Sequence, residues 1–364
     1  MSFSRGLAGA ACLLLAIGFA SAEEKVRIEG LFDAEYWNTD GGSYDIGVNE
    51  DAPAALGRLR LSALGEFFAG LQGFARGEAE GGEATYDGET QVYLEQAFVR
   101  YSFQRYPVMI DAGKIVNPIG NFSRRYLSSD NPLIGGQLNF LVTYPVGITV
   151  SGRNGMFDYM VAVLDSPMVN DTWVVPESSA APRPAVAAGL TPFVGTRIGV
   201  FGTMGPYLGK DSEDFLAADE SWKDFDQTVY GLDVRFSRGY FELNGELSWS
   251  FYDVPAGLGE VDGVGWYIEP KFTFTPRLFA ALRYEWSDWP YIEFDDPAFP
   301  TWYAGTVKAA YFEVALGYRI ANGLIAKTAY RQAHDFGEDY PDARSIAAQL
   351  SYAFDVGSWF RRPL

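Results

Sequence analysis

Hydrophobic and polar residues alternate at every second position along most of this chain. The stretch 241–249, FELNGELSW, is the clearest case: its odd positions are mainly Phe, Leu and Trp, and its even positions are Glu, Asn and Ser. A period of two places successive side chains on opposite faces of a β-strand, whereas a helix repeats every 3.6 residues. The pattern therefore predicts an all-β protein, but by itself it does not decide which face meets water.

Sixteen stretches with this alternation are bounded by Gly, Pro, Asn, Asp or Ser, which are typical of turns. The expected strands are 25–37, 54–66, 69–81, 90–104, 107–116, 144–153, 155–164, 184–191, 193–203, 227–237, 239–251, 264–275, 277–288, 308–320, 323–334 and 343–356. The stretch 184–191 is included partly because an antiparallel order requires a strand between its two neighbours.

The segments between these strands alternate in length. Short links occur at 105–106, 154, 191–192, 237–238, 275–276 and 321–322. Long polar segments occur at 38–53, 117–143, 165–183, 204–226 and 289–307. Short turns at one end and long loops at the other are typical of outer-membrane barrels. The predicted fold class is therefore a transmembrane antiparallel β-barrel of about sixteen strands, with short periplasmic turns and long extracellular loops.

The first part of the chain, 1–22, has the pattern of a secretory signal peptide. Arg5 precedes an apolar stretch, 7–20, and small residues at 20–22 provide a cleavage site. The barrel is then expected to occupy 23–364 as one domain. Because the only cysteine lies inside the signal segment, the mature chain is expected to contain neither a disulfide nor a cysteine metal site.

Composition agrees with an exported membrane barrel. Aromatic residues make up 16% of the chain, glycine contributes 40 residues and the hydrophobic fraction is an ordinary 48%. Such a chain suits strands that have one lipid-facing side. The side chains expected to face outward are Val26, Ile28, Phe32, Leu59, Leu61, Val99, Tyr101, Phe103, Ile148, Val150, Trp266, Ile268, Phe272, Leu278, Leu282, Trp286, Phe312, Val314, Leu316, Tyr318, Ile346, Leu350, Tyr352 and Phe354. The alternative is that they form the core of a soluble β-sandwich.

The opposite strand faces are rich in charge. The basic residues expected to face inward are Arg27, Arg58, Arg60, Arg76, Arg100, Arg153, Arg197, Arg235, Lys271, Arg283, Arg319, Lys327 and Arg331. The acidic residues are Glu29, Asp33, Glu35, Glu66, Glu78, Asp111, Asp233, Glu242, Glu246, Glu269, Glu285 and Glu313. Unpaired ions in a dry core would cost several kcal/mol each, so this density predicts water inside. A barrel of about sixteen strands is wide enough for an aqueous channel.

The net charge of −19 is expected to come mostly from loops, because the inward basic and acidic sets nearly cancel. Acidic stretches occur at 211–214, 219–220 and 293–296. They are expected to be solvated surface, with binding of divalent cations that bridge lipopolysaccharide as the alternative. Nucleic acid is not expected as a partner of so acidic a chain.

Four inward arginines come from neighbouring strands and are expected to form one basic patch on the wall. The segment 117–143 adds two more, and a loop folded inward beside this patch would narrow the channel and concentrate anions. The candidate constriction residues are Arg58, Arg60, Arg76, Arg100, Arg124, Arg125, Asp111 and Asp130. The alternative is that the arginines pair with Glu66, Glu78 and Asp130 and only brace the wall.

Three stretches of the same region carry a motif: 94–101 (LEQAFVRY), 111–120 (DAGKIVNPIG) and the segment from Arg124 to 131–133 (NPL). They resemble the signature region of the phosphate-selective-porin-like outer-membrane proteins. The resemblance extends over about 40 residues and implies a sixteen-stranded, often trimeric diffusion channel whose third loop enters the pore. The chain has no Lys/Arg-rich run of the kind that would form a dedicated phosphate ladder.

Other motifs carry weaker chemical signals. Gly113-Lys114 lacks the upstream glycine of a phosphate-binding loop. His334, the only histidine, is followed by Asp335 and precedes Ser345, which leaves open a membrane-embedded hydrolase in which His activates Ser. No cofactor is expected, and the carboxylates are too scattered for a metal site.

The sequence therefore predicts a porin in the bacterial outer membrane, a water-filled channel for passive diffusion of small hydrophilic solutes and ions with a bias toward anions. Its expected partners are outer-membrane lipid, lipopolysaccharide and the diffusing solutes, and its outward faces are compatible with a homotrimer. The alternatives are an outer-membrane enzyme of the lipase or protease type and a structural barrel with a plugged lumen.

Overall fold

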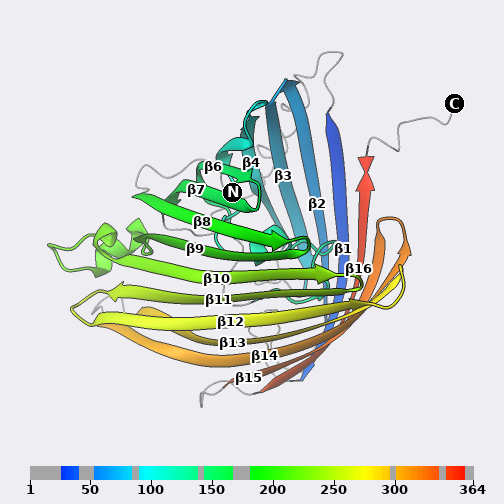
Figure 1. Ribbon diagram of the computed structural model, residues 1–364. Helices are drawn as coiled ribbons and strands as arrows, with labels where there is room; N and C mark the ends of the chain where they lie inside the picture. Colours follow the sequence, from blue (N-terminus) through cyan, green and yellow to red (C-terminus); the bar gives the residue numbers. More distant parts are fainter. Residues whose placement is uncertain are drawn as a thin grey trace.

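The computed structural model is a closed barrel of sixteen antiparallel strands (Figure 1). The strands follow one another around the barrel in sequence order, and β1 (Arg27–Asp40) pairs with β16 (Ala343–Asp355) to close it. The expected fold class is therefore confirmed. The structure describes residues 26–40, 53–83, 90–137, 143–166, 181–295, 301–335 and 342–356. The predicted signal peptide lies outside these residues.

Each of the sixteen expected strands is present. The other strands are β2 (Pro53–Phe68), β3 (Leu71–Gly82), β4 (Gln91–Ser102), β5 (Val108–Lys114), β6 (Val146–Asn154), β7 (Phe157–Ser166), β8 (Ala181–Phe193), β9 (Thr196–Pro206), β10 (Asp226–Arg238), β11 (Phe241–Val254), β12 (Gly259–Thr273), β13 (Leu278–Asp295), β14 (Thr301–Ala321) and β15 (Leu324–Asp335). Three short 3-10 helices are η1 (Phe122–Arg124), η2 (Lys210–Phe215) and η3 (Trp222–Asp224). None of the helices in the described part of the chain is long and apolar enough to cross a membrane.

One expected loop is wrong. The segment 289–307 was assigned to a long connection, but β13 and β14 continue through most of it and pair from Trp289 with Val307 to Asp295 with Thr301. Aromatic and β-branched residues recur in both arms of this segment, and such residues favour strands. The two strands therefore pair continuously from Leu278 opposite Tyr318 to Asp295 opposite Thr301 (Figure 1).

Closure of the barrel removes the free strand edges that an open sheet would expose. The closing pair is long, with register from Glu29 opposite Asp355 to Asp40 opposite Arg344. We call the end of the barrel that carries turns such as 194–195 and 239–240 the short-turn end, and the opposite end the long-loop end. β1 begins and β16 finishes at the short-turn end, as an even strand count requires.

The two faces of the strands differ as the alternation predicts. Outward side chains such as Phe32 (42% exposed), Val186 (53%) and Ile346 (62%) form an apolar belt. Their inward neighbours are buried, and Asp33 beside Phe32 has no exposed surface. Aromatic rings pack against one another on the outside, for example Tyr230 against Trp249 with centroids 5.5 Å apart. An apolar belt with aromatic residues near its rims is the outer surface of a membrane barrel.

The belt generates a prediction about lipid contact. Val186 lies mid-strand on the outward face of β8, whereas Val194 lies in the turn between β8 and β9 and is 99% exposed. We expect Val186→Arg to lower the free energy of unfolding by about 2 to 4 kcal/mol, because it places a charge at mid-bilayer depth. Val194→Arg should cost about 0 to 1 kcal/mol. Equilibrium urea unfolding in lipid vesicles measures both, and equal costs would contradict lipid contact of the belt.

Candidate channel constriction

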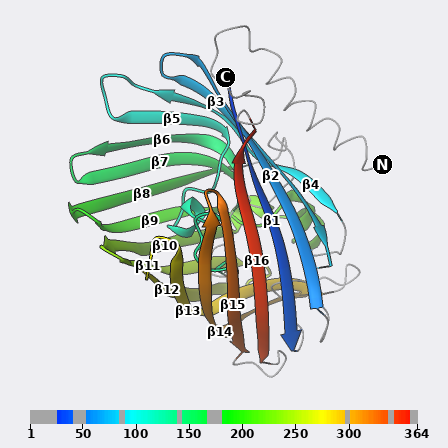
Figure 2. The same cartoon turned by 90° about the vertical axis from the view of Figure 1, so that its right-hand side faces the viewer.

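The chain turns into the barrel after β5 and runs across its interior, where it is seen in Figure 2 as the teal segment within the ring of strands. We call residues 117–137 the inner loop. Backbone hydrogen bonds join the chain that enters this loop to the chain that leaves it: Ile115 N donates to Pro145 O at 3.0 Å, and Asn117 N donates to Thr143 O at 2.8 Å. The inner loop is the described part of the long segment expected to fold inward.

The inner loop approaches the wall closely at Gly120. This residue has φ +77°, and a Cβ placed on it would lie 2.7 Å from Oε1 of Glu246 on β11. Glycine adopts this backbone conformation freely and leaves room for the carboxylate. The next residue, Asn121, donates its backbone N–H to Oε2 of Glu246 at 2.6 Å, and η1 follows.

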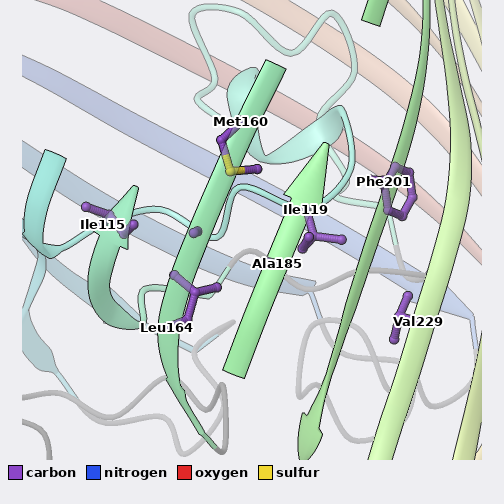
Figure 3. Close-up of a cluster of buried hydrophobic side chains, with 8 residues drawn as sticks. Ile115, Ile119, Met160, Leu164, Ala185, Phe201 and Val229 are labelled. Carbon is purple, nitrogen blue, oxygen red and sulfur yellow. The ribbon is translucent and has the colours of Figure 1, made fainter. Parts of the chain in front are cut away.

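One side of the inner loop packs against an apolar part of the wall. Figure 3 shows Ile115 and Ile119 beside inward side chains of β7 to β10. The wall residues in this cluster are Met160, Ala162, Leu164, Ala185, Phe201 and Val229. These side chains face the lumen, where the alternation predicted polar residues, and their burial under the loop explains why they are apolar.

The other side of the inner loop packs against small residues. Leu133 and Ile134 are buried together with Trp37 of β1. The wall at this level consists of alanines from four neighbouring strands: Ala281, Ala315, Ala329 and Ala347. Larger side chains at these inward positions would occupy the space of the inner loop. The alanines therefore leave the room in which Leu133 and Ile134 pack.

Charged wall residues bind the backbone of the inner loop. Nζ of Lys327 donates to the carbonyl oxygens of Ser128 and Asn131 at 2.7 Å and of Leu133 at 3.1 Å. Oε1 of Glu313 accepts the N–H groups of Ile134 at 2.9 Å and Gly135 at 3.0 Å. Because buried backbone groups need hydrogen-bond partners, these two strand residues fix the loop in the lumen.

Side chains of the inner loop also reach the wall. Ser128 Oγ donates to Asp33 Oδ1 at 2.5 Å, and Arg125 Nη1 donates to Glu269 Oε1 at 2.5 Å. Burial opposes the charge of Arg125, but Tyr267 and Glu269 outweigh it and raise the pKa of Arg125 above its ordinary value. The loop is thereby attached to strands on several sides of the barrel.

These contacts correct one step of the sequence argument. The sequence predicts water around the inward charges, yet Asp33 and Glu269 have no exposed surface and Arg283 has 1%. Arg283 donates to the carbonyl oxygens of Gly135 and Gly136 at 2.9 and 2.5 Å. Much of the inward charge is therefore compensated by the inner loop and by opposite charges, and it is not by itself evidence for a water-filled lumen.

The predicted basic patch is interleaved with acids. Arg58 binds Glu35 and Glu80, Arg60 binds Asp33 and Glu95, and both bind Glu78. Together with Arg76, which lies 4.0 Å from Glu95, three guanidinium groups of β2 and β3 face five carboxylates. Of the acids considered as bracing partners, Glu78 fills that role.

The remaining candidate residues occupy three different places. Arg100 forms two hydrogen bonds to Asp111, at 2.7 and 2.8 Å, near the short-turn end. Asp130 accepts from Ser129 Oγ at 3.1 Å on the inner loop. Arg124, on η1, is exposed, and its guanidinium group makes no hydrogen bond or ion pair with the described residues. Although part of its surface is accessible, the surrounding loop and wall remove much of the water around its guanidinium, and this desolvation together with the charge of Arg197 lowers the pKa of Arg124.

Glu95 was not among the candidates. The β3–β4 register shifts between Arg76 and Gly77, so Glu95 is the extra residue of a bulge on β4. Its Oε1 accepts from Arg60 Nε at 3.0 Å and from Tyr144 OH at 2.9 Å. A bulge re-aims a side chain without leaving a clear trace in an alternating pattern, so the sequence signal for Glu95 was only the motif that contains it.

The enzyme alternative finds no support in the geometry. Ser345 faces inward and its Oγ lies 3.0 Å from Oγ1 of Thr39. His334 lies on the outward face, opposite Ala310, and its Nδ1 is 2.5 Å from Oδ1 of Asp342. The serine and the histidine therefore lie on opposite faces of the sheet and form no catalytic pair. Within the described residues, no three His, Cys, Asp or Glu side chains are placed to hold a metal ion.

A cavity of about 330 Å³ lies below the inner loop at the short-turn end. Its lining includes Arg27, Glu29 and Arg76 from the wall, and Leu127 and Ser129 from the inner loop. Arg76 donates to Ser62 Oγ and to Tyr126 OH at 2.8 and 3.0 Å. Charged groups of both signs thus border space on this side of the loop.

Sixteen strands closed into a barrel, with one loop folded inside, are the fold of the outer-membrane porins. The anion-selective porin from Comamonas acidovorans matches with TM-score 0.62 and 9% identity over 91% of this chain and 100% of that one. OmpF of Salmonella typhi, in complex with daunomycin, matches with TM-score 0.60 and 11% identity over 91% and 98%. OmpT of Vibrio cholerae, in a trimer form, matches with TM-score 0.58 and 9% identity over 92% and 100%.

At these identities the structural matches establish the fold alone. The sequence matches no protein-family model and no curated protein. The resemblance of 94–133 to the phosphate-selective-porin-like proteins therefore stays a prediction.

The first prediction for the inner loop concerns Lys327. Lys327→Met leaves three buried carbonyl oxygens without their charged donor, and breaking such a buried interaction costs about 3 to 5 kcal/mol. We expect amide hydrogen exchange in 117–137 to become at least about a hundredfold faster. Lys271→Met is the matched control, because its ammonium binds Glu242 at 2.8 Å on the neighbouring strand. Unchanged exchange in Lys327→Met would show that the ammonium does not hold the loop.

A second prediction uses two adjacent glycines. A Cβ on Gly135 would clash with Nη1 of Arg331 and lie 2.6 Å from Oε2 of Glu313, whereas one on Gly136 would meet nothing within 4 Å. We expect Gly135→Ala to lower the free energy of unfolding by about 1 to 3 kcal/mol, because the acceptor of two loop N–H groups must move. Gly136→Ala should change it by less than about 1 kcal/mol. Urea unfolding compares the pair, and equal values would contradict the close fit.

Proposed function

We propose that this protein is an outer-membrane porin that lets small hydrophilic solutes and ions diffuse passively across the membrane. The observation that carries the proposal is the inner loop, which crosses a barrel of sixteen strands and divides a lumen lined by charge. A barrel of this size has room for an aqueous path beside a loop, whereas about eight strands are filled by side chains. No catalytic group or cofactor is needed for such transport.

The proposed location follows from the chain and its outer surface. A cleaved signal peptide at 1–22 would export the protein, and the apolar belt suits lipid and lipopolysaccharide as its surroundings. A homotrimer is part of the proposal, supported by the trimer form of OmpT of Vibrio cholerae. Membership of the phosphate-selective-porin-like group is supported by the motif in 94–133, which forms β4, β5 and the inner loop.

We further propose a bias toward anions. Of the sequence-derived set Arg58, Arg60, Arg76, Arg100, Arg124 and Arg125, most members are held by carboxylates and contribute little net positive charge. Arg124 differs, because it is exposed on η1 and has no acidic partner within 4.0 Å among the described residues. The anion bias is therefore assigned mainly to the part of the lumen that Arg124 faces.

The second candidate function is a structural barrel with a plugged lumen. The specific observation in its favour is that the inner loop is held on both sides, by the apolar cluster around Ile119 and by the alanines around Leu133. A loop attached in this way either constricts or closes the lumen, and current through the barrel distinguishes the two.

Single-channel recording of the purified protein in a planar bilayer tests the proposal. We expect stepwise openings in KCl and a reversal potential in a salt gradient that corresponds to anion preference. Heat-modifiable migration on a gel serves as the control for a folded barrel. A folded barrel without current would favour the plugged alternative, and a cation-selective current would keep the porin while removing the anion bias.

A further inference from the structure

Two arginines lie directly opposite each other on the lumen side of the wall. Arg197 of β9 and Arg235 of β10 are register partners near the short-turn end. Like charges directly opposite on an antiparallel pair repel each other and destabilise the sheet. The placement therefore needs a compensating negative charge close to both side chains.

Of the two, only Arg197 forms ion pairs with carboxylates of the described residues. Arg197 binds Asp158 of β7 at 2.7 Å and Asp233 of β10 at 2.5 Å. It lies flat against the wall, because a Cβ on Gly189 or Gly199 would clash with its guanidinium group. Both nearby carboxylates are thus engaged by the same arginine.

Arg235 is left without such a partner. Its Nε is buried and has no hydrogen-bond acceptor among the described residues, and no ion pair to it is formed there. The charges that act on it are those of Arg197, Arg124, Asp233 and Asp158. Glu246, which is opposite Asp233 on β11, accepts the backbone N–H of Asn121 instead.

Arg124 joins this pair from the inner loop. η1 begins directly after Asn121, whose N–H binds Glu246 opposite Asp233, so Arg124 lies near the same part of the wall. The charges of Arg197, Asp233 and Asp158 act on its guanidinium there. Arg124 is exposed within the barrel, and its guanidinium group, like that of Arg235, forms no hydrogen bond or ion pair with the described residues. Three guanidinium groups therefore meet two carboxylates, and two of the three remain open to a ligand.

We propose that Arg124 and Arg235, backed by Arg197, form a binding site for a small oxyanion in the lumen on the short-turn side of η1. The ligand class follows from the donors, because a planar guanidinium group presents paired N–H groups that match two oxygens of a carboxylate or phosphate. One oxyanion held between the loop and the wall would relieve the repulsion of Arg197 and Arg235. The site deepens the proposed function, since it places a binding step on the path of a diffusing anion.

The experiment combines current with thermal unfolding. Inorganic phosphate and, separately, acetate are added to the full-length mature protein in KCl. We expect one or both to reduce the chloride current with saturation and to raise the unfolding temperature, because a ligand that binds only the folded state stabilises it. Arg235→Gln removes one charge-assisted hydrogen bond to the oxyanion. The oxyanion concentration that gives half of the maximal effect should therefore rise about tenfold or more. The same variant should be at least as stable as the original protein without anion, because the like-charge pair is gone.

Arg319→Gln is the matched control, because Arg319 of β14 is also near the short-turn end but lies over the ring of Phe279, and other strands separate it from Arg197 and Arg235. Its oxyanion response should equal that of the original protein. The proposed site would be wrong if phosphate and acetate changed neither the chloride current nor the unfolding temperature of the original protein. It would also be wrong if Arg235→Gln and Arg319→Gln weakened these two effects equally. In either case, a current in KCl alone would still support the proposed porin function. If no current is seen, but the oxyanion raises the unfolding temperature and Arg235→Gln removes this rise, the proposed porin function would be wrong and the proposed oxyanion site would be supported. Comparison of phosphate with acetate identifies the oxyanion.

Discussion

The backbone of the inner loop lies inside the barrel, and its N–H and C=O groups must find partners there. A loop on the surface would use water for this purpose, whereas a buried one depends on side chains around it. Lys327 supplies a donor to three carbonyl oxygens, and Glu313 and Glu246 supply acceptors to three N–H groups. The charged wall and the inner loop therefore require each other, since each compensates polar groups that the other leaves buried.

This mutual requirement explains the composition of the lumen. Charges are present where backbone crosses the barrel, apolar side chains are present where Ile115 and Ile119 touch the wall, and alanines are present beside Leu133. A lumen that only held water would show a more uniformly polar inner face. The type of each inward residue thus depends on which part of the inner loop it contacts. The loop in turn sets the free cross-section that a solute would meet.

Much of the fold could be predicted from the sequence because the two faces of each strand have different surroundings, lipid outside and the lumen inside. This difference produces the alternation of apolar and polar residues along the chain. The outer parts of β13 and β14 were missed, because 289–307 has the polar composition of a loop, with an acidic stretch at 293–296. Pairing in the constriction could not be predicted, since Arg125 and Glu269 are 144 positions apart and meet only after closure. The inward alanines at 281, 315, 329 and 347 were a usable signal, because four small residues on neighbouring strands indicate an object packed against them.

The distribution of charge around the lumen is unequal. Near β1 to β4, the guanidinium groups of Arg58, Arg60 and Arg76 are outnumbered by five carboxylates, whereas near β7 to β10 three guanidinium groups face two. These two parts of the wall are separated by other strands on both sides of the closed barrel. Opposite excesses on separate walls produce an electric field across the lumen rather than along it, and low-dielectric walls concentrate that field. Under the proposed function, an anion and a cation inside the lumen would therefore be attracted to different sides of the inner loop.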